Sequence, residues 1–286
     1  MGNKVFGVGL SRSGTSSLSL ALNEMGIATA HCPHDFSTIK RNVASTDSPV
    51  AALFKDLDRI FPDSQFILTV RNKSKWLESC EEFWRLMGRC FNESLFLTIL
   101  HRQLYGSSGF DRGLYSEAYD RHHDNVYRYF SNRPTDLLVL NVGVDTKIME
   151  KMGVFLNREI PYLDFPRSHS IKVIHQRVYA LMNSSISMDE VCEISYTSRD
   201  YLEWIESNIF DVHDASLSAI KGSRLLEDMI ARAYLMYEDR EAVSELLCVD
   251  LSAVDYVVSN RIENTSIFRR AIRRAIRRVK RLSERY

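Results

Sequence analysis

The chain has 286 residues, 45% of them hydrophobic, so it can bury one sizeable core with room for a second, smaller unit. Its 37 basic and 37 acidic residues balance, but residues 269–286 carry nine Lys or Arg against one acid, Glu284. The rest of the chain holds 28 basic and 36 acidic residues, a net charge of −8. This split indicates an acidic body with a basic tail that meets an anionic partner.

The cysteines argue against a disulfide framework and against a zinc site, because they form no CxxC pair and their number is odd. No segment approaches the ~18 apolar residues of a membrane span, and no signal-peptide pattern is visible. We therefore expect reduced thiols, no metal site and a cytoplasmic protein.

The first half of the chain alternates strand and helix patterns. An apolar strand is expected at residues 4–10 and a helix at 14–26, followed by a polar, irregular stretch over 29–49. Pro49 then opens a helix over 50–61, and "FILTVR" is a buried strand. A helical pattern with breaks runs from Ser74 to Phe130, and "LLVLNV" is another buried strand.

This alternation predicts an α/β fold with a central, mostly parallel sheet flanked by helices. After residue 168 the pattern becomes helical, which predicts a small all-helical C-terminal unit. We therefore divide the chain into a core at 1–168, a helical module at 171–262 and a basic amphipathic helix at 266–286.

The loop after the first strand has the shape of a phosphate loop. Gly9 and Gly14 have the spacing of GxxxxGK[ST], but Thr15 stands where an ATPase has its lysine. Backbone N–H groups and the helix N-terminus would still bind a phosphate, and Arg12 supplies a positive charge. Hydroxyl donors follow at Thr15, Ser16 and Ser17. The alternative is an ordinary glycine turn between a strand and a helix.

A second arginine lies where the next predicted strand ends. Arg71 closes "FILTVR", and Ser79 follows eight residues later. Side chains at the carboxyl end of such a strand point into the crevice where open α/β sheets bind ligands. A kinase would need a carboxylate for magnesium there, whereas an arginine suits another phosphate. The sequence thus offers two phosphate sites and no evident Mg²⁺ ligand.

Together these motifs resemble the sulfotransferases that use 3′-phosphoadenosine 5′-phosphosulfate (PAPS), in a bacterial-type branch with a P-loop-like fold. In that family a [KR]SGT[ST] loop holds the 5′-phosphosulfate, and an Arg with a Ser eight residues later holds the 3′-phosphate. The matching residues here are Arg12, Ser13, Gly14, Thr15, Ser16 and Ser17 in the loop, and Arg71 and Ser79 after the strand. The phrase "FLNREIPYLDFP" is similar to the end of the family core, so the resemblance covers about residues 4–168.

The resemblance implies metal-free, in-line transfer of a sulfuryl group from PAPS to a hydroxyl or amine. The acceptor would be a small molecule, a carbohydrate or a glycolipid. Arg12 would stabilise the charge that develops on the leaving phosphate. Two other functions compete with this one: a degenerate P-loop nucleotide kinase, and a non-catalytic nucleotide-binding protein that engages a partner.

The general base has three candidates. The family's cytosolic branch has its base histidine before a proline, as "THLP", and "TDSP" places Asp47 there. Branches with a glutamate base place it roughly twenty residues past the loop, and His34 lies 22 residues past Arg12. We favour Asp47, with His34 and His31 as alternatives. The same motif is typical of a helix cap, in which Asp47 or Ser48 accepts backbone N–H groups.

The sequence leaves the roles of one tryptophan and two histidines near these motifs undecided. Trp76 either stacks on the adenine or packs against the sheet. His122 and His123 lie in a polar helical stretch, where solvated or capping roles are expected.

The tail has one apolar face, formed by Phe268, Ile272, Ile276, Val279 and Leu282. By its charge such a helix suits an anionic membrane surface, nucleic acid or an acidic partner face, and docking on the acidic body is the alternative. Nucleic acid is not expected as a partner, because the segment 240–263, which faintly resembles a helix-turn-helix, is not basic. The sequence does not define an oligomeric state.

Overall fold

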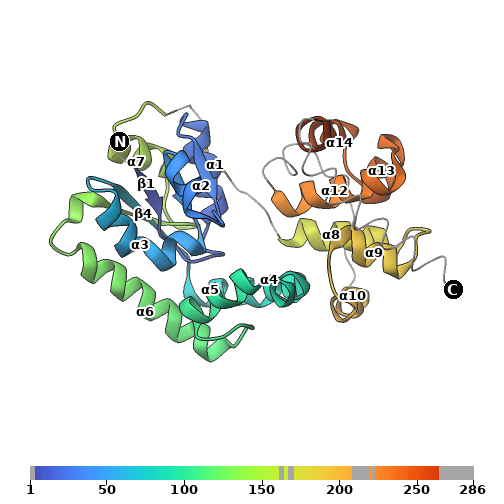
Figure 1. The fold of residues 1–286 in the computed structure, drawn as a ribbon, viewed down its shortest axis with the longest axis horizontal. Helices are drawn as coiled ribbons and strands as arrows, with labels where there is room; N and C mark the ends of the chain where they lie inside the picture. The colour runs from blue at the N-terminus through green and yellow to red at the C-terminus, as the bar shows by residue number, and fades with distance from the viewer. Residues whose placement is uncertain (1–3, 161–163, 167–170, 208–219, 221–222, 264–286) are drawn as a thin grey trace. The chain divides into compact units, whose positions relative to one another are not determined.

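The structure, a computed structural model, describes residues 4–160, 164–166, 171–207, 220 and 223–263. The chain divides into two compact units, Met1–Ser168 and His169–Tyr286 (Figure 1). The predicted basic helix at 266–286 lies outside the described residues.

The described part of the first unit contains a five-stranded parallel sheet with the strand order β2-β3-β1-β4-β5. The strands are β1 (Val5–Gly7), β2 (Thr29–His31), β3 (Ala44–Thr46), β4 (Gln65–Val70) and β5 (Leu137–Asn141). Val5 is in register with Ala44 on one side and with Gln65 on the other, so the sheet continues across β1. The predicted α/β fold with a parallel sheet is therefore confirmed.

Two of these strands lie in the stretch that the sequence indicated to be irregular. Residues 29–49 contain β2, the short helix α2 (Phe36–Arg41) and β3. β3 reads Ala-Ser-Thr and is buried throughout, between β1 and β2. A polar strand of three residues has no hydrophobic periodicity, so its pairing with neighbouring strands is what defines it.

Helices cover both faces of the sheet (Figure 1). α1 (Thr15–Glu24) and α7 (Ile148–Leu156) pack with Val5 and Ile67 in one core cluster. α3 (Ser48–Ile60) and α6 (Arg112–Phe130) pack with the adjacent strand residues Phe6 and Phe66 in another. Successive strand residues point to opposite faces, so both faces of these strands are apolar and buried.

The long helical pattern after β4 forms three helices. They are α4 (Lys73–Glu93), α5 (Leu95–Tyr105) and α6. Ser94 caps the start of α5 by accepting the N–H of Leu97, and Gly106 ends it in a left-handed conformation. A 3₁₀ turn, η1 (Pro134–Asp136), leads into β5.

The described part of the second unit is built of helices. They are α8 (Ile171–Met182), α9 (Met188–Ser195), α10 (Arg199–Glu206), α12 (Arg224–Tyr237), α13 (Arg240–Leu247), α14 (Leu251–Val257) and a π-helical turn, η2 (Val258–Glu263). Side-chain caps begin several of them, including a capping box between Ser187 and Glu190. Arg177 is buried in α8 and donates to the carbonyls of Leu247 and Cys248 at the end of α13.

Candidate active site

Two glycines shape the loop between β1 and α1. Gly14 directly precedes α1 and has a φ of 107°, a conformation that other residues rarely adopt. Gly9 is required because the loop passes close to β4 at this point. A Cβ at position 9 would lie 2.0 Å from Thr69 Oγ1. No side chain caps the start of α1, so its first N–H groups are available to an anion.

The hydroxyl groups of the loop have different roles. Ser13 is buried, and its hydroxyl donates to the carbonyl of Leu10 (2.6 Å) and lies 2.8 Å from Thr69 Oγ1. Ser13 therefore holds the loop in shape through its side chain. Ser17 is buried within α1, whereas Thr15 and Ser16 contact the two acid–base candidates described below.

Arg12 and Arg71 lie beside each other where β1 and β4 end. Arg12 Nε donates to Ser79 Oγ (3.3 Å), and Arg71 Nη1 donates to the carbonyl of Arg12 (3.3 Å). The Arg12 guanidinium also lies over the ring of Phe83, 4.8 Å from its centre. The structure thus brings together residues of the two predicted phosphate sites. Arg12 and Ser79, which contact each other, are 67 positions apart in the sequence.

The two arginines have no acidic partner in the described parts of the chain. Neither guanidinium lies within 4.0 Å of a carboxylate oxygen there. Burial lowers the pKa of Arg12, and the nearby charge of Arg71 also lowers it. The charges of Asp47 and Glu82 raise the pKa of Arg12, but neither carboxylate is in direct contact with it. Two neighbouring cations without a carboxylate in contact indicate a site for an anion.

Asp47 follows β3 and touches the phosphate loop. Its Oδ1 accepts hydrogen bonds from Ser11 Oγ (2.6 Å) and Thr15 Oγ1 (3.3 Å), and its Oδ2 lies 3.5 Å from His31 Nε2. Asp47 stands at the N-cap position of α3, but its side chain makes no capping hydrogen bond. The capping role considered for Asp47 is therefore wrong, since the carboxylate faces the loop.

His31 is held at the end of β2 through both ring nitrogens. Nε2 lies 3.0 Å from Ser16 Oγ, and Nδ1 lies 3.0 Å from Thr46 Oγ1. The His31 side chain is 32% exposed and that of Asp47 only 10%, so His31 is the more accessible member of the pair. His34 is exposed and stacks on Phe96, with ring centres 5.1 Å apart. The described contacts of Asp47 thus include His31 and not His34.

Three side chains from α4 and α6 hold the backbone of the site. Trp76 Nε1 donates to the carbonyl of Ser11 (2.8 Å), Tyr119 OH donates to that of Arg71 (2.6 Å), and His122 Nε2 contacts that of Val8 (2.7 Å). Trp76 is fully buried, so its indole packs in the core and does not present a face to an adenine. The sequence contained no signal for these bonds, because they depend on where the helices cross the sheet.

His122 and His123 are buried, so the solvated role expected for them is wrong. Burial lowers the pKa of His122 to about 4. The ring is therefore neutral near pH 7 and donates to a carbonyl rather than carrying charge into the core.

The described residues contain no group of three or more His, Cys, Asp or Glu side chains that could hold a metal ion. The sequence showed no evident Mg²⁺ ligand at a strand end, but Asp47 is a carboxylate that directly follows β3 and lies beside the phosphate loop. This position of Asp47 could not be predicted because β3 was not predicted.

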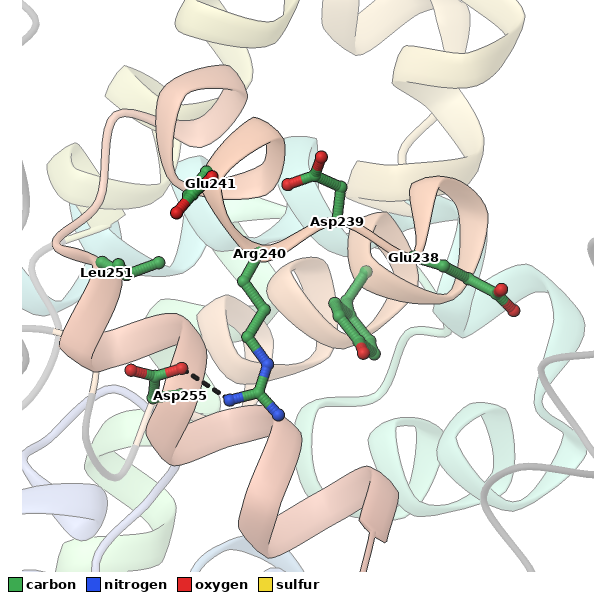
Figure 2. A pocket seen from close by; sticks show the side chains of 7 residues that line it. Glu238, Asp239, Arg240, Glu241, Leu251 and Asp255 are labelled. Atoms are coloured by element: carbon green, nitrogen blue, oxygen red, sulfur yellow. Dashed lines mark hydrogen bonds and ion pairs between the residues drawn. The ribbon is translucent and has the colours of Figure 1, made fainter.

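A surface pocket of about 400 Å³ lies in the helical unit (Figure 2). Tyr234 and Leu251 line it with charged side chains, among them Arg240, whose guanidinium pairs with Asp255 at 2.7 Å. None of the predicted phosphate-binding residues lines this pocket. No helix in the described ranges has the length and the apolar character needed to cross a membrane.

The family comparison agrees with this geometry. A model of the sulfotransferase domain matches residues 4–43 and 34–174, which is more than half of the chain. The search of curated proteins found no match. The chain therefore belongs to the sulfotransferase domain family, and the class of activity is that of a transferase.

Proposed function

We propose that this protein transfers the sulfuryl group of PAPS to a hydroxyl or amine acceptor without a metal. The observation that carries the proposal is the pair Arg12 and Arg71, which lie side by side without a carboxylate partner in the described residues. A donor with phosphate groups at both its 5′ and 3′ positions supplies the two anions that such a pair needs.

The loop after β1 and the end of β4 would each bind one of the two anionic groups of the donor. Backbone N–H groups at the start of α1, with Arg12, would hold the 5′-phosphosulfate. Arg71 and Ser79 would hold the 3′-phosphate. The hydrogen bond from Arg12 to Ser79 would then be replaced by hydrogen bonds to the ligand. Ser13 keeps the loop in shape, and Gly9 lets it lie against Thr69.

In the reaction, the acceptor oxygen or nitrogen forms a bond to sulfur while the bond from sulfur to the bridging phosphate oxygen breaks. Arg12 and the loop N–H groups stabilise the negative charge that develops on that bridging oxygen. The acceptor's proton passes to the pair formed by His31 and Asp47, which contact each other and the loop. We propose that His31 and Asp47 act together as the general base, in which Asp47 supplies the negative charge.

Calorimetry with 3′,5′-ADP, AMP and ATP tests the nucleotide. We expect tight binding of 3′,5′-ADP and weak binding of AMP, because AMP lacks the 3′-phosphate. Turnover is then tested with labelled PAPS and a panel of hydroxylated acceptors. Preferential binding of ATP with Mg²⁺ would contradict the proposal.

One observation favours a nucleotide kinase as the second candidate. Asp47 directly follows β3 and accepts a hydrogen bond from Thr15 in the loop, where a kinase would hold Mg²⁺ through a carboxylate and a hydroxyl. The loop lacks the lysine, however, and Asp47 also accepts from Ser11 and contacts His31. Phosphate transfer from ATP, measured in the same assays with and without Mg²⁺, separates the two enzymes. Binding of 3′,5′-ADP without any turnover would instead indicate a non-catalytic module.

A further inference from the structure

Helix α5 lies along the side of the site where Asp47 is found. It packs on α3, the helix that Asp47 precedes. Burial lowers the pKa of His101 and raises that of Tyr105, and the Asp47 carboxylate acts on both, so the inner face of α5 is near that carboxylate. The hydroxyl oxygens of Tyr105 and Ser48 are both buried there, and Ser48 acts on the hydroxyl of Tyr105.

The first turn of α5 is apolar and faces solvent. Leu95 is 75% exposed, Ile99 is 56% exposed and Phe96 is 39% exposed. Their spacing of three and four positions places them on one side of the helix. Residues 95–99 read "LFLTI" and contain no charged side chain, so this strip offers little to a phosphate or a sugar. Exposed apolar patches of this kind mark binding surfaces.

The strip is continuous with the site. Phe96 stacks on His34, and His34 is only three residues beyond His31, whose Nε2 lies 3.5 Å from Asp47. The outer end of α5 therefore lies beside the loop that leaves β2, and its inner end lies beside Asp47. The helix rises about 9 Å between His101 and Leu95. The exposed strip takes up about 6 Å of this rise, between Leu95 and Ile99, and the path from the strip to the acid–base pair suits a flexible hydrocarbon chain better than a single planar ring.

We infer that Leu95, Phe96 and Ile99 (the α5 strip) bind the hydrocarbon chain of an amphiphilic acceptor whose hydroxyl or amine reaches His31 and Asp47. The inference rests on the proposed function, since it names the acceptor class of the same site. Apolar contacts away from the reacting atoms would supply binding energy that holds the acceptor in place.

Calorimetry with n-alkyl β-D-glucosides tests the α5 strip on the full-length protein saturated with 3′,5′-ADP. Methyl, butyl and octyl glucosides carry the same hydroxyl groups and differ only in chain length. We expect affinity to rise about two- to four-fold for each methylene buried, and thus by at least about ten-fold from butyl to octyl. The double variant Leu95→Ser/Ile99→Ser should remove this rise and leave the affinity for 3′,5′-ADP unchanged.

Val154→Ser is the matched control, because Val154 is 85% exposed on α7, which packs against β5. This variant should keep the dependence on chain length. The inference is overturned if affinity does not rise with chain length, or if it rises equally in the double variant. Failure of 3′,5′-ADP itself to bind would instead refute the proposed function.

Discussion

Replacing Arg71 with alanine tests whether this residue recognises a 3′-phosphate. Arg71 is half-buried where β4 ends, and the one described hydrogen bond of its side chain is from Nη1 to the carbonyl of Arg12 at 3.3 Å. The ligands 3′,5′-ADP and AMP differ only in the 3′-phosphate. A loss confined to 3′,5′-ADP therefore measures the contact with that group, whereas distortion of the loop would weaken both ligands.

The expected loss follows from the chemistry of the contact. A hydrogen bond between charged groups contributes about 1.5–3 kcal/mol, and about 1.4 kcal/mol corresponds to ten-fold in affinity. Arg71→Ala should therefore weaken 3′,5′-ADP roughly ten- to a hundred-fold and change AMP little. Arg71→Lys should lose less, because it keeps the charge but not the planar fork.

The assay is titration calorimetry at one fixed ionic strength, with both nucleotides and each variant. Arg102→Ala, an exposed arginine on α5, is the control for the change in net charge and should bind as the wild type does. Equal weakening of both nucleotides by Arg71→Ala would refute the reasoning. In that case Arg71 acts only through the Arg12 carbonyl, and the 3′-phosphate is bound elsewhere.

Further predictions concern the base, a buried histidine and the tail. Asp47→Asn and His31→Gln should each lower turnover of labelled PAPS about 10²-fold with 3′,5′-ADP affinity unchanged; full activity of both, with none in His34→Ala, would move the base to His34. The pKa of His122 is about 4 in the folded protein, below its usual value near 6.5. Between these two values the unfolded state binds a proton that the folded state does not, so the stability that the neutral His122 supports is fully present above pH 6.5 and is lost as the pH falls toward 4. Denaturant melts should show a loss of stability over this window, of which His122 contributes up to about 3 kcal/mol, and a correspondingly smaller loss in His122→Gln; equal losses would contradict the role of His122. Deleting residues 267–286 should abolish salt-sensitive binding to anionic vesicles, to which each basic residue contributes about 1 kcal/mol, and leave nucleotide binding intact. No vesicle binding by the full chain, or a lower melting temperature after truncation, would mean that the tail packs against protein.

Features that depend on local chemistry were predictable. The strands β1 and β4 have apolar runs that are buried on both faces, and the glycines at 9 and 14 mark the loop between β1 and α1. β5 is also a predicted strand, but the expectation that it is buried is wrong, because it ends the strand order of the sheet and Val139 is 37% exposed. The helices described within residues 171–207 and 223–263 also follow from periodicity. The parallel sheet could be inferred because strands that alternate with helices must return in the same direction.

Features that depend on partners distant in sequence were not predictable. β3 is three residues long and polar, and it is a strand because β1 and β2 pair with its two edges. The buried position of Trp76 likewise depends on the crossing of α4 over the loop. Helix α2 did carry a local signal that was missed, because Asp35 caps it by accepting the N–H of Thr38 (2.8 Å).

The sequence by itself predicted a phosphate site and named the residues of its loop, because Gly9, Arg12 and Gly14, with Arg71 after the next apolar strand, have the local spacing of phosphate-binding motifs. The tertiary structure decided which side chains meet. It places β3 beside β1 and β2, so the ends of β2 and β3 bring His31 to Asp47 across 16 positions of sequence. It also brings Arg12 to Ser79, by placing the start of α4 next to the loop. Strand order is set by the packing of the whole sheet against its helices, and no local pattern encodes it.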